Sequence, residues 1–218
     1  MKFPGTEKTI LIFKQIALTS VLIAFSSIAC ADATTDYQQG LDAYRAGDVV
    51  GAMTPLKQAA DAGHAAAQAL YGTILDSAEF DNDAANYLRK AAEQNNADGQ
   101  YGLAKMYLSG EAKAPTNGEA NRLMRAAAAQ GHKRATIAMA LAYINGDARL
   151  DATNKDTPEA GQFLLQAAEL GELDAVTVIA TAYRTGGYGL AADPSKAEHW
   201  KEQLARMRAQ APKKGSKK

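Results

Sequence analysis

Pairs of adjacent alanines recur along the chain at intervals that are typical of repeat proteins. The pairs begin at Ala59, Ala91, Ala127 and Ala167, so successive pairs are 32, 36 and 40 residues apart. Another alanine stands seven residues before each pair, and offsets of this kind place side chains on one stripe of an α-helix. A glycine or asparagine follows four residues after each pair begins, and both residue types tolerate the left-handed conformation in which helices often end. The pattern predicts one amphipathic helix per repeat, ending at Gly63, Asn95, Gly131 and Gly171.

A second periodic segment follows each of these glycine or asparagine residues. After Gly131, for example, small residues stand at the fourth and ninth places and larger ones at the eighth and twelfth, namely Ala135, Ala140, Met139 and Tyr143. Small residues let two helices approach closely, and the larger ones fill the space between layers. We therefore predict an all-α fold, an α-solenoid of about five stacked antiparallel helix pairs. Each pair can bury its apolar stripe only against the next, so the array should unfold cooperatively.

The composition agrees with this prediction and argues against several kinds of chemistry. Alanine accounts for 47 of the 218 residues and aromatic residues for only 7%, which favours helices over sheets. A single cysteine excludes an internal disulfide and a cysteine-based zinc site, and the three histidines are scattered, so we expect no metal. The chain has no Gly-x-Ser-x-Gly and no His-Glu-x-x-His motif. We expect neither catalysis nor a cofactor.

The last two repeats resemble the Sel1-like repeat, a relative of the tetratricopeptide repeat. The residues that carry the resemblance are Tyr143, Gly146, Asp156, Ala160, Phe163, Ala167 and Ala168, and then Tyr183, Gly186, Asp193, Ala197, Trp200 and Ala205. The resemblance extends over roughly residues 36–208. It implies stacked helix pairs and a role in binding other proteins.

The first 31 residues have the features of a secretory signal peptide. Three lysines precede an apolar run over residues 16–25, and Ala29-Cys30-Ala31 provides small residues for cleavage before Asp32. The uncharged stretch has 17 residues, whereas a membrane-spanning helix needs about 20 apolar ones. We predict a bacterial periplasmic protein. An uncleaved anchor, secretion, or an outer-membrane lipoprotein modified at Cys30 are the alternatives, because Ser27-Ile28-Ala29-Cys30 faintly resembles a lipobox.

The predicted solenoid occupies residues 32–210, and a basic tail that we expect to be disordered occupies residues 211–218. The predicted repeats cover residues 33–63, 64–95, 96–131, 132–171 and 172–210. Residues 32–205 carry 23 acidic and 15 basic residues, whereas six basic residues and no acidic one follow. An acidic body repels nucleic acid, so we expect no nucleic-acid partner.

Several polar residues have a structural interpretation. His64 and His132 each follow a repeat-ending glycine, so we expect both to be exposed at a helix start. Asp48, Asp156 and Asp193 each stand four residues before the first alanine of the next helix, so we expect them to be N-caps. The fourth repeat has about four extra residues in the loop 148–155, which is either a tolerated insertion or a functional loop.

Function is expected on the helix that opens each repeat, which we call the leading helix. Its third, sixth, tenth and thirteenth places share one face, which lines the concave groove in tetratricopeptide-like arrays. The predicted partner-binding residues are Asp98, Tyr101, Lys105, Leu108, Arg134, Ile137, Leu141, Ile144 and Arg184. We call five of them, Tyr101, Leu108, Ile137, Leu141 and Ile144, the apolar row. An exposed apolar row rimmed by charge is typical of a peptide-binding groove; the alternative is that a neighbouring helix buries it.

The sequence therefore predicts an exported adaptor or scaffold that binds another envelope protein or a peptide and performs no chemistry. One alternative is a scaffold anchored to the envelope through Cys30, and another is a hydrolase acting on cell-wall or peptide substrates. We expect membrane contact only if Cys30 is lipidated or the signal peptide is not cleaved.

Overall fold

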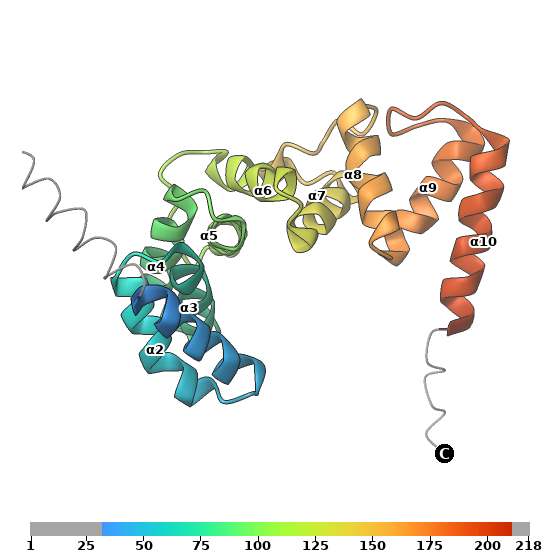
Figure 1. The fold of residues 1–218 in the computed structure, drawn as a ribbon. Coiled ribbons are helices and arrows are strands. Elements are labelled where there is room, and N and C mark those ends of the chain that lie inside the picture. The colour runs from blue at the N-terminus through green and yellow to red at the C-terminus, as the bar shows by residue number, and fades with distance from the viewer. Residues whose placement is uncertain (1–31, 211–218) are drawn as a thin grey trace, which may run out of the picture. The chain divides into compact units, whose positions relative to one another are not determined.

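The computed structural model describes residues 32–210, and every regular element of that part of the chain is helical (Figure 1). Residues 32–45 are helical and lead into α2. The following elements are α2 (Val49–Asp61), α3 (Ala65–Ser77), α4 (Asp81–Glu93), α5 (Ala97–Ser109), α6 (Glu119–Ala129), α7 (Lys133–Asn145), the short 3-10 helix η1 (Ala148–Leu150), α8 (Pro158–Glu169), α9 (Leu173–Thr185) and α10 (Pro194–Gln210). The predicted signal peptide and the predicted basic tail lie outside the described residues.

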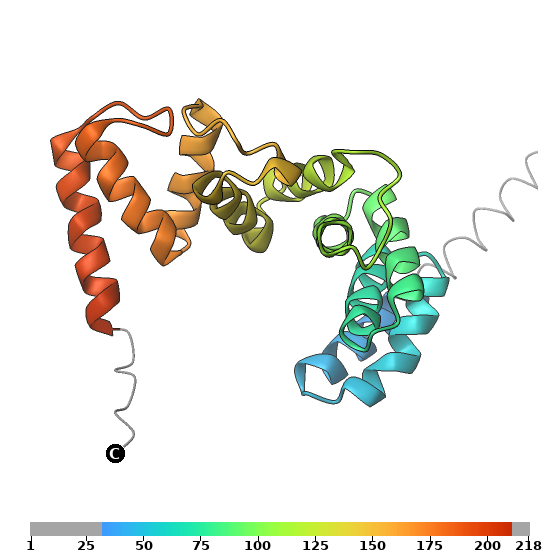
Figure 2. The same cartoon turned by 180° about the vertical axis from the view of Figure 1, so that it is seen from behind.

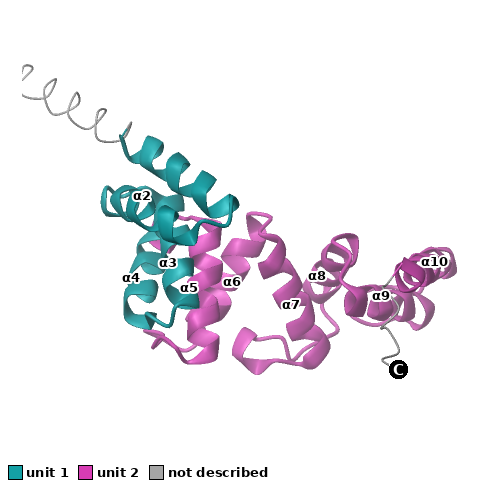
Figure 3. Cartoon of the chain, turned by 90° about the horizontal axis from the view of Figure 1, so that it is seen from below, with its two compact units in different colours: residues 1–91 teal, residues 92–218 magenta. Residues whose placement is uncertain are grey.

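The chain divides into two compact units, residues 1–91 and residues 92–218 (Figure 3). In compact unit 1, α2 packs on α3. In compact unit 2, each helix from α5 to α10 packs on the next one along the chain, and Figure 2 shows α9 and α10 side by side. Helices that pack on their neighbours in sequence are the mark of a helical repeat array. The predicted all-α solenoid is confirmed, whereas its cooperative unfolding stays a prediction.

The predicted repeat ends adopt the left-handed backbone conformation. Gly63, Gly131 and Gly171 have φ angles of 93°, 80° and 86°, and Asn95 has a φ angle of 59°. A side chain with a branched Cβ would be strained at such positions, because the left-handed region crowds Cβ against the backbone. The residues that mark the period in the sequence are therefore the residues that reverse the chain between repeats.

Close helix contacts occur at the ninth place of the leading helix, as predicted. A Cβ atom added to Gly72 would lie 2.9 Å from Cγ of Leu88 on α4, which is too close for a real contact. The equivalent residues on α5 and α7 are Ala104 and Ala140, and both are fully buried. Ala140 belongs to the core cluster of compact unit 2 together with Leu164 and Ile179. Small residues thus set the distance between stacked helices.

The polar residues at helix starts were predicted with mixed success. Asp48 caps α2 by accepting from the Gly51 amide at 2.8 Å, and Asp193 accepts from two amides at the start of α10. The prediction for Asp156 is wrong, because Thr157 caps α8 and the Asp156 carboxylate accepts from the Tyr188 amide at 2.9 Å. The loop that carries Tyr188 packs against the start of α8 and so takes this carboxylate away from the helix.

His64 and His132 are helix caps, and the prediction that they are exposed is wrong. Nδ1 of His64 accepts from the Ala67 amide at 3.2 Å, and Nδ1 of His132 accepts from the Ala135 amide at 3.1 Å. Each imidazole stacks on a tyrosine ring of the preceding leading helix, with 4.5 Å between centroids in both cases. The tyrosine ring covers the imidazole, which leaves both histidines half-buried.

We expect Ala140→Leu to lower the free energy of unfolding by about 1 to 3 kcal/mol, because the larger side chain overpacks a contact that has no free space. Chemical denaturation monitored by circular dichroism measures the change. The exposed Ala148→Leu is the control and should alter stability little. An Ala140→Leu chain as stable as the parent would contradict the helix contact.

We expect the stability of compact unit 1 to fall as the pH is lowered below about 6.5, the ordinary pKa of histidine. Burial lowers the pKa of His64, so the unfolded chain binds a proton more readily than the folded one in this range. Protonation also removes the lone pair with which Nδ1 caps α3. Urea unfolding at pH 7.5 and pH 5.5 measures the loss.

The variant His64→Asn should keep the cap and remove the pH dependence that this histidine causes, because asparagine is a good N-cap and does not titrate. His199→Asn is the matched control on the exposed side of α10. An identical pH dependence in the His64→Asn chain and in the parent would show that the cap does not titrate.

Candidate partner-binding surface

The apolar row lies on α5 and α7, and all five of its side chains are half-buried. Ile137 and Ile144 pack against the core cluster of compact unit 2, whereas Leu141 is not part of that packing. The row is therefore neither an open hydrophobic surface nor interior core. Its role as a binding site stays a prediction.

The charged residues predicted at the rim fall into two groups. Lys105, Arg134 and Arg184 are exposed on α5, α7 and α9. Asp98 is exposed as well, and its carboxylate lies 3.1 Å from Nε2 of His132, the imidazole that stacks on Tyr101. Two predicted residues of α5 thus meet a histidine of the next repeat that was not predicted to belong to the site. Nδ1 of His132 accepts a hydrogen bond from the Ala135 amide. The imidazole hydrogen is therefore on Nε2, which faces the Asp98 carboxylate.

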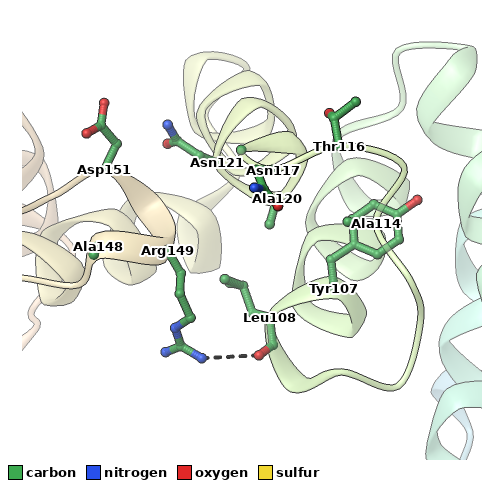
Figure 4. A pocket seen from close by; sticks show the side chains of 11 residues that line it. Tyr107, Leu108, Ala114, Thr116, Asn117, Ala120, Asn121, Ala148, Arg149 and Asp151 are labelled. Carbon is green, nitrogen blue, oxygen red and sulfur yellow. Dashed lines mark hydrogen bonds between the residues drawn. The ribbon is translucent and has the colours of Figure 1, made fainter.

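A pocket of about 430 Å³ opens beside the end of α5 (Figure 4). The residues that line it come from the end of α5, the loop that follows, the start of α6 and the segment around η1: Tyr107, Leu108, Ala114, Thr116, Asn117, Gly118, Ala120, Asn121, Ala148, Arg149 and Asp151. Leu108 belongs both to this pocket and to the apolar row. The other residues were not predicted individually, although the extra length of the loop 148–155 was a signal in the sequence.

Arg149 fastens the η1 wall of the pocket. Its Nε and Nη2 atoms donate to the Asp147 carboxylate at 3.1 and 2.7 Å, and Nη1 donates to the Leu108 carbonyl oxygen at 3.1 Å, the bond drawn in Figure 4. The Arg149 guanidinium lowers the pKa of Asp147 through these hydrogen bonds. At the far end of the same loop, Nζ of Lys155 donates to the Ile144 carbonyl oxygen at 2.8 Å. Arg149 therefore holds one end of the loop to α5, and Lys155 holds the other end to α7.

A polar cluster supports the α6 wall of the pocket. The Tyr143 hydroxyl donates to Oε2 of Glu159 at 2.7 Å, and Arg125 pairs with the same carboxylate. Nε of Arg125 donates at 2.7 Å to Oδ1 of Asn121, a residue that lines the pocket. This cluster joins α6, α7 and α8, so a pocket residue is oriented by two neighbouring repeats.

The described residues contain no group of three or more His, Cys, Asp or Glu side chains placed to hold a metal ion. Within the same residues, no helix has the length and apolar character needed to cross a membrane. The arrangement of the site is one of apolar side chains, amide groups and paired charges, which suits the binding of a polypeptide.

Three solved structures have the same architecture. The first is a Sel1 repeat protein of Oxalobacter formigenes, with 23% identity and a TM-score of 0.61 over 81% of this chain and 72% of that one. The second is a protective antigen of uropathogenic Escherichia coli strains that displays the SLR fold, with 24% identity and a TM-score of 0.60 over 80% of this chain. The third, from Klebsiella pneumoniae and described as a Sel1 repeat protein, has 20% identity and a TM-score of 0.53 over 83% of this chain and 95% of that one.

The chain has the Sel1-like repeat fold. No protein-family model and no curated protein matches the sequence. The chain spans 38% of the length of the Escherichia coli antigen, so it corresponds to part of that Sel1-like repeat protein. At these identities the likeness is one of fold, and the function of this chain has to be argued from its own surface.

Proposed function

We propose that the chain is a protein-binding scaffold that holds a peptide segment of another envelope protein and performs no chemistry of its own. The observation that carries the proposal is that Leu108 connects the apolar row to the pocket beside η1. A polypeptide segment needs such a combination, because one or two of its side chains must be buried while its backbone finds hydrogen-bonding partners.

The polar groups of the pocket suit a peptide backbone. Asn117 and Asn121 supply amide groups close to the apolar side chains of Leu108 and Ala120. The Arg149 guanidinium is already paired with Asp147, so it adds little net charge to the pocket. The exposed charge of Arg134 lies at the rim of the apolar row and can steer a partner toward it.

We expect Leu141→Lys to leave the chain folded and to abolish partner capture, because an ammonium group in an apolar contact costs several kcal/mol, whereas in water it costs almost nothing. Crosslinked pull-down from envelope extracts measures capture, and circular dichroism measures folding. Lys105→Ala at the rim is the control and should retain capture. A folded Leu141→Lys chain with unchanged capture would exclude the apolar row.

A second variant tests the pocket separately from the row. Ala148 is exposed on η1, so Ala148→Trp should fill the pocket without disturbing the core. Loss of capture in this variant alone would move the site to the loop 148–155 and the pocket that it lines. Loss of helicity in Leu141→Lys would likewise place Leu141 in the core.

The proposed periplasmic location predicts a mature chain that begins at Asp32. The supporting features lie in residues 1–31, outside the described part of the chain. Intact-mass measurement of the exported protein should give the mass of residues 32–218. A chain that begins at Cys30 with added acyl mass, together with palmitate labelling, would favour the lipoprotein scaffold instead.

A further inference from the structure

Two asparagines of compact unit 2 are each followed directly by a glycine. They are Asn117, in the loop between α5 and α6, and Asn145, the last residue of α7. In such a pair the backbone nitrogen of the glycine can attack the side-chain amide of the asparagine, because the two groups belong to neighbouring residues and glycine has no Cβ atom to obstruct the approach. The sequence contains no other Asn-Gly pair, so the two sites can be compared within one chain.

The surroundings of Asn117 permit this reaction. Asn117 is exposed, lies outside the helices and lines the pocket beside the end of α5, as Figure 4 shows. Within residues 32–210, no hydrogen bond engages the Asn117 side chain or the amide of Gly118. The two groups that must meet, Cγ of Asn117 and the nitrogen of Gly118, are therefore not held apart by hydrogen bonds to the described part of the chain.

The surroundings of Asn145 oppose the same reaction. Asn145 is equally exposed, but it belongs to α7, and the amide of Gly146 donates to the Ala142 carbonyl oxygen. Attack by the Gly146 nitrogen would have to break this hydrogen bond and open the last turn of α7. Exposure alone therefore does not distinguish the two sites, whereas the backbone around them does.

We infer that Asn117 is a site of spontaneous deamidation and that the fold protects Asn145. The Gly118 nitrogen forms a bond to Cγ of Asn117, the bond between Cγ and Nδ2 breaks, and ammonia leaves with the amide proton of Gly118. Water then opens the resulting succinimide ring at either of its carbonyl carbons. Opening at Cγ gives aspartate, and opening at the main-chain carbonyl carbon gives isoaspartate. The sum consumes water, releases ammonia and needs no oxidant or reductant.

The reaction changes a wall of the pocket. The amide of Asn117 both donates and accepts hydrogen bonds, whereas the carboxylate that replaces it only accepts. Its negative charge stands next to Gly118, the N-cap of α6, where the helix dipole stabilises an anion and favours retention of the fold. A peptide carbonyl group that pairs with the Asn117 amide would lose its partner. Weaker capture follows, and this consequence alone rests on the proposed scaffold function.

The test is incubation of the folded full chain at mildly alkaline pH, followed by peptide mapping with mass spectrometry, which detects the replacement of an amide by a carboxyl group. We expect Asn117 to convert at least about five-fold faster than Asn145, the protection expected from one backbone hydrogen bond. Asn117→Gln should abolish conversion at this site, because the longer side chain forms the corresponding ring far more slowly, and should leave the rate at Asn145 unchanged.

The unfolded chain provides the matched control. Each pair is preceded by a β-branched residue and followed by an acidic one, namely Thr116 and Glu119 in one case and Ile144 and Asp147 in the other. In guanidinium chloride we therefore expect the two sites to convert at similar rates. Equal rates in the folded chain, faster conversion of Asn145, or the same ratio of rates with and without guanidinium chloride would overturn the inference.

The effect on the pocket is measured with Asn117→Asp, the aspartate form of the product, and Asn145→Asp as its control. In the crosslinked pull-down we expect Asn117→Asp to capture roughly two- to ten-fold less partner than the parent, the effect of one lost hydrogen bond, and Asn145→Asp to capture as much as the parent. Equal capture by both variants would overturn the effect on the pocket. A parent chain that captures nothing would instead contradict the scaffold function, and the two conversion rates would still decide whether Asn117 is the reactive site.

Discussion

Stacking in this chain depends on the contact between a small residue of one helix and a larger side chain of the next. Gly72 on α3 lies so close to Leu88 that even a methyl group would clash there. In the next two repeats the equivalent residues are Ala104 and Ala140, and both are fully buried. Helices that approach this closely exclude water and bring many atoms into van der Waals contact. An array made mostly of alanine, with few aromatic residues, can therefore still have a dense core.

The close packing of the helices also explains where the polar groups lie. A tightly packed array has little room for side chains between helices, so capping groups lie at the helix ends and ion pairs lie on the exposed sides of the helices and at the turns. His132 caps α7 while stacking on Tyr101, and Arg149 fastens the η1 segment to α5. The candidate partner-binding surface accordingly combines turn residues with the half-buried apolar row.

Much of the fold could be predicted from residue spacing because the relevant interactions are local. The left-handed ends at Gly63 and Asn95 follow from backbone sterics, and the buried alanines follow from the helical period. The candidate site was only partly predictable. Leu108 was predicted from its place on the helix, whereas Asn117 and Ala148 reach the same pocket from loops whose path no periodicity describes.

The amino-acid sequence by itself determined the helical stripes and the left-handed residues at Gly63, Asn95, Gly131 and Gly171, since each depends on residues only a few places apart. Only the tertiary structure decided how far the apolar row is covered, that Thr157 caps α8 in place of Asp156, and that Arg149 reaches the Leu108 carbonyl oxygen. Asp156 meets the Tyr188 amide across 32 positions, and Arg149 meets Leu108 across 41. Contacts between residues so far apart depend on how repeats and loops pack in space, which no local pattern encodes.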